Sequence, residues 1–259
     1  MPITIDITNT INDDCEGWWP MDDGSGTTAR DISGNGNDGT LNGGVGWGTG
    51  PTGSGGATTY TNSGSEGITV THDATLAIVG DMTVCAWVKM PSFPSFHGAL
   101  QKGTSYPNPY GLVIGTSAEQ YLTSGDGGSQ DYALSTNPVP TDTWCCIAGV
   151  RSGTDLTLYL DGSANGTTTI NVTPTDGAGD LVLGNRTDYA TPFYGALSSV
   201  RVWSRALSGA EISALYADPY EGQYVEPTAD PPTPATAPLS SDRLYNRTLT
   251  RIFRRGETG

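Results

Sequence analysis

Short apolar stretches, separated by clusters of turn-forming residues, constrain this chain more than any other feature of its sequence. Residues 67–71 (GITVT), 82–89 (MTVCAWVK) and 156–160 (LTLYL) are rich in the β-branched and aromatic side chains that favour strands. Asp161-Gly162 directly follows the last of them and is typical of a hairpin turn. Helical periodicity is almost absent, so the pattern predicts an all-β protein, an antiparallel β-sandwich or jelly roll. Further strands are expected at 110–114, 144–150, 180–183 and 196–203.

One short helix is expected near residues 209–217. Ser208 and Glu211 fit a capping box, in which each side chain bonds the backbone amide of the other residue. Ile212 and Leu215 follow on one helical face, and an Asp-Pro pair ends the segment. The helix should therefore pack on the sandwich through this apolar face.

Composition divides the chain into four parts. Residues 1–14 alternate apolar and polar side chains and predict an N-terminal arm. Residues 15–224 contain the strand-like stretches and the helix, and form the predicted sandwich. Residues 225–239 are proline-rich and predict a stiff linker, and residues 240–259 form an arginine-rich C-terminal tail that we expect to be extended from the sandwich.

The C-terminal tail has the pattern of a docking segment. Arg243, Arg247 and Arg251 are spaced by four residues, which suits an amphipathic helix, while threonines at 248 and 250 leave a strand open. The tail is too short to bury a core of its own, so it is either disordered or docked on a partner, which we expect to be an acidic neighbouring subunit. The residues expected to contact this partner are Arg243, Arg247, Leu249, Arg251, Ile252, Phe253 and Arg254.

The charge of the chain argues against nucleic-acid binding. The net charge is −15, from 12 basic and 27 acidic residues, and five of the basic residues lie in the tail, so the sandwich is strongly acidic. No segment reaches the ~18 consecutive apolar residues of a membrane span. The N-terminal sequence MPITIDITNTINDD has neither the basic region nor the apolar region of a secretion signal, and none is expected.

The four cysteines, Cys15, Cys85, Cys145 and Cys146, do not have the spacing of zinc ligands, and the chain has only two histidines. Adjacent strand residues point to opposite faces, so Cys145 and Cys146 cannot share one core position. Buried free thiols are the favoured interpretation, and a disulfide through Cys15 or Cys85 is left open.

The stretch DISGNGNDGT at residues 31–40 combines residues that tolerate tight turns with oxygen-bearing side chains. Asp31, Ser33, Asn35 and Asn37 alternate along it, and calcium takes about six to eight oxygen ligands of this kind. These four residues are the predicted ligands of a structural Ca²⁺ ion. The alternative is a turn without metal, in which Asp31 caps backbone amides.

Several motifs, in this order, resemble the laminin G-like, concanavalin A-like jelly-roll family. Residues 17–26 (GWWPMDDGSG) and 31–39 (DISGNGNDG) resemble the opening of the family's domain. Residues 83–89 (TVCAWVK) resemble its tryptophan strand, and residues 158–162 (LYLDG) resemble its hairpin. Residues 193–212 resemble its closing strand and helix. The resemblance covers about residues 15–217. It implies a concanavalin A-like sandwich, a structural calcium near residues 31–37, and a function in glycan binding or adhesion. Relatives often carry an acidic pair in the closing strand where this chain has Ser198-Ser199.

Catalysis is not expected, because glycosidases on such a sandwich use two or three carboxylates along one strand and the expected strands are almost free of acidic residues. A sugar site needs exposed aromatic rings with polar side chains nearby. The loop-rich stretches 93–111 and 187–195 offer such rings, although rings of this kind also pack under loops as part of the core. The predicted sugar contacts are His97, Tyr106, Tyr110 and Tyr189.

These features together predict a non-catalytic adhesion or decoration module of a bacteriophage virion, made in the host cytoplasm and exposed on the virion surface. Its partners would be other virion subunits, reached through the N-terminal arm and the tail, and cell-surface polysaccharide of the host. A homo-oligomer is compatible with the sequence. The alternatives are a bacterial extracellular carbohydrate-binding module at the cell surface and a structural spacer without a ligand.

Overall fold

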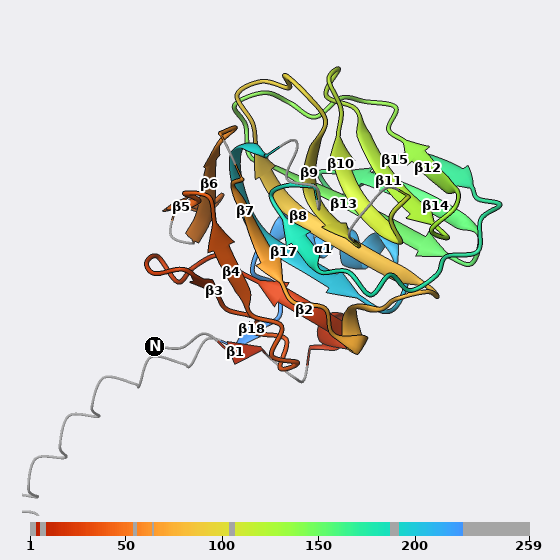
Figure 1. The fold of residues 1–259 in the computed structure, drawn as a ribbon, viewed down its shortest axis with the longest axis horizontal. Coiled ribbons are helices and arrows are strands. Elements are labelled where there is room, and N and C mark those ends of the chain that lie inside the picture. Colours follow the sequence, from red (N-terminus) through yellow and green to blue (C-terminus); the bar gives the residue numbers. More distant parts are fainter. Residues whose placement is uncertain are drawn as a thin grey trace, which may run out of the picture. The chain divides into compact units, whose positions relative to one another are not determined.

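Two antiparallel sheets stacked face to face form the protein, as the sequence predicts (Figure 1). The computed structural model describes residues 4–5, 9–53, 56–63, 65–103, 107–186 and 192–224. In order across the sheet, sheet I consists of β12 (Gln130–Leu134), β11 (Gln120–Gly125), β10 (Tyr110–Ile114), β9 (His97–Lys102), β16 (Leu181–Leu183), β7 (Gly67–Val70), β4 (Gly39–Asn42) and β3 (Thr28–Ala29). Sheet II consists of β15 (Ser163–Thr169), β14 (Asp155–Leu160), β13 (Cys145–Ser152), β8 (Met82–Lys89), β17 (Tyr194–Trp203), β6 (Gly56–Thr61) and β5 (Gly46–Thr49), with β2 (Cys15–Trp19) also paired to β17.

The main core lies between the sheets and follows from the alternation of side chains along each strand. In β8, Val84, Ala86 and Val88 face this core, whereas Cys85 and Trp87 face the other side of sheet II. Both faces of β8 are therefore buried, which explains why residues 84–88 (VCAWV) are all apolar. The hairpin expected at Asp161-Gly162 joins β14 to β15, and both turn residues have positive φ (48° and 77°), as a two-residue hairpin turn requires.

The helix α1 (Gly209–Ala217) covers the outer face of sheet II and confirms the predicted helix. Ser208 and Glu211 form the capping box, with the Ser208 amide donating to Glu211 Oε2 at 2.7 Å. Ile212 and Leu215 are buried against a second apolar cluster on that face. None of the helices among the described residues is long and apolar enough to span a bilayer.

A buried arginine fastens the chain beyond α1 to β17. The Arg201 side chain is 1% exposed, and its guanidinium carbon lies 3.5 Å from the centre of the Trp18 ring. It donates to the carbonyl oxygens of Pro219 (2.8 Å) and Glu221 (2.7 Å). Burial lowers the pKa of Arg201 to about 10, so the group is still charged at neutral pH.

All four cysteines are buried and are free thiols in this structure, in agreement with the favoured interpretation. Cys145 faces the main core and Cys146 faces the α1 side, as adjacent strand residues must. Cys85 Sγ lies 3.6 Å from Cys146 Sγ. Burial raises the pKa of Cys15 and of Cys145 to about 12, so both thiols are protonated at neutral pH.

Part of the N-terminal segment lies against the sandwich. The strand β1 (Thr4–Ile5) pairs with β18 (Gln223–Tyr224), and the short 3-10 helix η1 (Thr10–Asn12) buries Ile11. The indole nitrogen of Trp203 donates to the Ile11 carbonyl oxygen at 2.8 Å. The predicted linker and C-terminal tail, residues 225–259, lie outside the described residues.

Candidate functional site

The outer face of sheet I carries a polar and aromatic surface over β9 to β12. The strand register places Gln101, Gly111, Thr123 and Tyr132 opposite one another on four successive strands. Side chains at these positions point away from the core, because their neighbours Leu100, Leu112, Leu122 and Ala133 point into it. A single row of outward side chains therefore crosses four strands.

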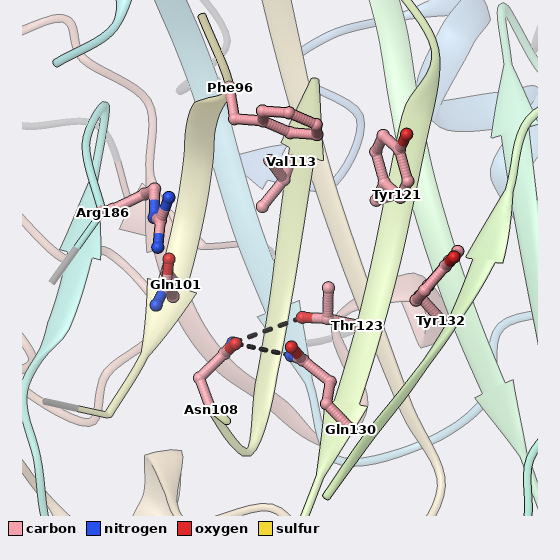
Figure 2. A pocket seen from close by; sticks show the side chains of 9 residues that line it. All are labelled: Phe96, Gln101, Asn108, Val113, Tyr121, Thr123, Gln130, Tyr132 and Arg186. Atoms are coloured by element: carbon pink, nitrogen blue, oxygen red, sulfur yellow. Dashed lines mark hydrogen bonds between the residues drawn. The ribbon is translucent and has the colours of Figure 1, made fainter. Parts of the chain in front are cut away.

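A pocket of about 270 Å³ lies over this row (Figure 2). Tyr121 and Tyr132 lie on one side of it, and Arg186 and Gln101 lie on the other. The described residues that line the pocket are Phe96, Gln101, Asn108, Val113, Tyr121, Thr123, Gln130, Tyr132 and Arg186.

Three aromatic rings in contact form one wall of the pocket. The ring centres of Phe96 and Tyr121 are 5.6 Å apart, and those of Tyr121 and Tyr132 are 5.4 Å apart. Phe96 is 41% exposed and Tyr132 is 52% exposed, so two neighbours of Tyr121 in this contiguous aromatic patch are open to solvent. The Tyr121 hydroxyl donates to Glu119 Oε1 at 2.9 Å, and partial burial together with this carboxylate raises the pKa of Tyr121 to about 12. The ring is thus neutral and held in place.

Two amide side chains, from Asn108 and Gln130, form the polar end of the pocket. Asn108 Nδ2 donates to the Tyr110 carbonyl oxygen at 2.7 Å, and Gln130 Nε2 donates to Asn108 Oδ1 at 2.6 Å. A glycine at 111 allows this arrangement, because a Cβ there would lie 3.0 Å from Asn108 Nδ2. The Asn108 amide can therefore lie close over β10.

The charge of the pocket is opposite to that of the protein. Its described lining contains one cation, Arg186, and no carboxylate. Rings for stacking, amides for hydrogen bonding and one guanidinium suit the binding of a polar, ring-shaped ligand. A lining without carboxylates does not provide the acid–base pair that glycoside hydrolysis requires.

The structure places the predicted sugar contacts differently from the expectation. Tyr110 is fully buried and its hydroxyl donates to the Leu76 carbonyl oxygen at 2.9 Å. His97 is fully buried, its Nδ1 donates to the Pro192 carbonyl oxygen at 2.8 Å, and burial lowers its pKa. Both side chains face the core, because the register pairs His97 with the core residue Ile114, so neither ring is available for sugar stacking. Tyr106 and Tyr189 lie outside the described residues.

The loop at residues 31–37 is built around the Asp31 carboxylate. Its Oδ1 accepts from the amides of Trp18 (2.9 Å) and Ser33 (2.8 Å), and its Oδ2 accepts from the amide of Asn37 (2.9 Å) and from Ser33 Oγ (2.8 Å). The Asn35 side chain donates to the Cys15 carbonyl oxygen. The loop is thereby tied to β2.

These contacts are those of a capped turn. Four donors point at Asp31, and a cation would need the same oxygen lone pairs, so the arrangement does not fit a calcium ligand set. The described residues also contain no group of three or more His, Cys, Asp or Glu side chains suited to a metal. The calcium ion stays a prediction from the family resemblance, and removal of calcium with EDTA distinguishes it from the capped turn.

We expect Asp31→Asn to lower the free energy of unfolding by about 2 kcal/mol, since it replaces a charged acceptor by an amide that presents a donor to buried N–H groups. Urea unfolding measures this loss, with Asp38→Asn as the matched control, because Asp38 accepts only from the Asp31 amide and is exposed. EDTA should leave the melting temperature of the unmodified protein unchanged. A clear drop in EDTA that added calcium reverses would contradict the capped-turn interpretation.

Proteins of a known family resemble this chain. The family described as the concanavalin A-like lectin/glucanases superfamily matches residues 62–213, more than half of the chain. No curated protein matches the sequence.

Solved structures with similar folds include binding domains of bacterial toxins, a domain of an arabinanase and a sialidase. The binding domain of Paraclostridial Mosquitocidal Protein 1 has a TM-score of 0.66 at 15% identity, covering 82% of this chain and 53% of that one. Domain 4 of AbnA, a GH43 extracellular arabinanase from Geobacillus stearothermophilus, was solved in complex with arabinotriose. It has a TM-score of 0.65 at 18% identity, covering 78% of this chain and 98% of that one. Botulinum neurotoxin type C, whose cell entry depends on interaction with two ganglioside molecules, has a TM-score of 0.64 at 11% identity, covering 80% of this chain and 52% of that one. The chain thus spans about half of two of these structures and nearly all of the arabinanase domain, and at such identities the likeness shows the fold alone.

Proposed function

The chain belongs to the concanavalin A-like lectin/glucanase superfamily, and on this basis we propose that it is a non-catalytic carbohydrate-binding module. The proposed site is the pocket on the outer face of sheet I. The observation that carries the proposal is the wall of three aromatic rings, Phe96, Tyr121 and Tyr132, beside the amides of Asn108 and Gln130.

Sugar rings have an apolar face of C–H groups and an edge of hydroxyls. The aromatic wall suits the first, and the Gln130 amide, which the buried Asn108 side chain holds in place, suits the second. The arabinotriose bound by the arabinanase domain and the gangliosides of botulinum neurotoxin type C are consistent with this use of the fold, although their sites are their own.

The proposal excludes glycoside hydrolysis at this pocket. Retaining and inverting glycosidases place two carboxyl groups about 5 to 9.5 Å apart around the scissile bond. No Asp or Glu is among the described lining residues. A bound oligosaccharide should therefore be recovered intact after incubation with the protein.

A glycan array tests the proposal. The full chain, labelled with a fluorophore, should bind a related subset of oligosaccharides, and Tyr132→Ala should remove that signal. Failure to bind any glycan on a broad array would overturn the proposal and favour a spacer without a ligand.

We further propose that the module is displayed on a virion surface and that the arginine-rich tail anchors it there. The support is the sequence of residues 225–259, where a proline-rich segment precedes arginines and apolar residues. A bacterial extracellular carbohydrate-binding module is the alternative, in which the same tail would contact another surface component.

Truncation before Pro227 separates anchoring from ligand binding. We expect the shortened chain to keep its melting temperature and carbohydrate binding, but to remain in the supernatant when phage particles from the producing cells are sedimented. The full chain should sediment with the particles. Equal sedimentation of both chains would exclude the tail as anchor, and absence of the full chain from the particles would exclude the virion.

A further inference from the structure

We propose that the pocket selects carbohydrates that carry a carboxylate, and that Arg186 binds this group. The inference rests on the proposed function and specifies its ligand class. Arg186 lies across the pocket from Tyr121 and Tyr132, so a sugar stacked on the rings would direct an edge substituent toward the guanidinium (Figure 2).

The other arginines of the described residues are not part of the pocket lining. Arg151 donates to the carbonyl oxygens of Ile78 and Gly80, and Arg201 to those of Pro219 and Glu221. Arg30 pairs with Asp23 at 2.6 Å, and Arg205 pairs with Glu211 at 2.7 Å. Arg186 differs from these four because its side chain lines a pocket.

The backbone that presents Arg186 is fixed. Asn185 is fully buried; its Nδ2 donates to the Glu66 carbonyl oxygen, and its Oδ1 accepts from the Arg186 amide at 2.7 Å. The same residue packs on β9, where a Cβ at Gly98 would lie 2.5 Å from the Asn185 carbonyl oxygen. The side chain therefore starts from a defined position at the edge of the pocket.

Guanidinium chemistry points to a carboxylate. The planar fork of Arg donates two parallel N–H bonds to the two oxygens of a carboxylate, a geometry that a hydroxyl cannot match. The Gln101 side chain lies beside Arg186 in the pocket (Figure 2). The described lining contains no Asp or Glu to repel the ligand.

The overall charge of −15 acts against an anionic ligand, so the two effects must be compared. At physiological salt the Debye length is about 8 Å, and charges farther away than this are largely screened. One carboxylate, that of Glu119, is near, because it accepts from the Tyr121 hydroxyl of the aromatic wall. The Arg186 guanidinium would contact the ligand carboxylate directly and therefore outweighs Glu119 and the more distant acidic residues. Binding should also weaken as salt is added, because the contact is an ion pair at the protein surface.

The first test is an array that presents uronate- and sialate-bearing oligosaccharides beside the same oligosaccharides with their carboxylates methyl-esterified. We expect binding to the free acids and loss of about 10- to 100-fold in affinity on esterification, the range for a hydrogen-bonded charged pair. Equal binding of acid and ester, or binding of neutral glycans alone, would overturn the carboxylate inference while leaving the carbohydrate-binding proposal intact. A preference for sulfated glycans alone would also overturn it. No binding at all would overturn both.

Variants then identify the residue. Arg186→Gln should reduce affinity for the free acid about 10- to 100-fold and leave affinity for the ester unchanged, because only the acid uses the charge. Arg186→Lys should restore part of the affinity, since it keeps the charge but not the fork. The matched control, Arg30→Gln, removes the same charge from a partly exposed salt bridge outside the pocket and should bind as the unmodified protein does. If Arg30→Gln weakens binding as much as Arg186→Gln, net charge rather than Arg186 sets the preference.

Discussion

Tyr121→Ala is expected to weaken carbohydrate binding by about 30-fold or more, the effect of losing a central aromatic contact worth at least ~2 kcal/mol. Tyr121 is the middle ring of the wall and touches both Phe96 and Tyr132. Its removal takes away one stacking surface and also the lateral support of the other two. Together with Tyr132→Ala, it should abolish measurable binding. Isothermal titration with the best-bound oligosaccharide of the array measures both effects.

Two controls separate the ring from other contributions. Tyr121→Phe keeps the ring and removes the hydroxyl that donates to Glu119, and it should bind almost normally. Tyr216→Ala removes a tyrosine that is 43% exposed on α1, stacked on Trp87, and should not affect binding. If Tyr121→Phe loses as much affinity as Tyr121→Ala, the hydroxyl and not the ring is the important contact.

Arg201→Ala is expected to lower the free energy of unfolding by about 4 kcal/mol, because it removes a buried charged donor from two carbonyl oxygens, of which Pro219 keeps only the bond from Ser199 Oγ. The guanidinium satisfies the carbonyl oxygens of Pro219 and Glu221 and covers the Trp18 ring. Alanine removes the two donors and opens a cavity at a side chain that is 1% exposed. The segment after α1 should detach from β17 at lower urea than the rest of the sandwich unfolds.

Urea and thermal unfolding measure this loss, which corresponds to a melting temperature lower by about 10 °C for a domain of this size. Arg30→Ala is the matched control, because the Arg30 side chain forms a partly exposed salt bridge with Asp23, a contact worth at most ~1 kcal/mol. Similar losses for the two variants would show that burial of Arg201 contributes little. They would then contradict the expectation.

The fold could be predicted from the sequence where local signals agree with the tertiary structure. The stretch at 82–89 became β8 with the same bounds, because a strand buried on both faces has a mostly apolar sequence. The helix α1 was predictable because its capping box and its apolar face lie within nine residues. The order of strands across each sheet has no local signal, so the sequence indicated a sandwich but not which strands neighbour each other.

The site was harder to predict because it depends on which residues of each strand point outward and which point into the core. Tyr110 and Tyr121 are both aromatic residues beside turn-forming segments, but β10 begins with an inward position and β11 presents Tyr121 outward. The strands β11 and β12 have mixed sequences, QYLTSG and QDYAL, whose weak apolar character hides them. The alternation of apolar and polar side chains along them was the available signal for a strand. Arg186 joins the pocket only through long-range strand pairing, which no local pattern shows.

The position of α1 limits how strongly one copy of the protein can hold a surface. Because α1 and its apolar cluster cover the outer face of sheet II, the proposed carbohydrate contact of the described residues is confined to one side of the sandwich. The part of each chain that the structure describes then offers one such contact, and a ligand in a shallow pocket of this kind dissociates readily. Several chains carried side by side would rebind neighbouring sugars before the first contact is lost, and avidity of about 10²- to 10⁴-fold can arise in this way without any new contact. Attachment would thus depend on the number and spacing of copies more than on the affinity of any single pocket.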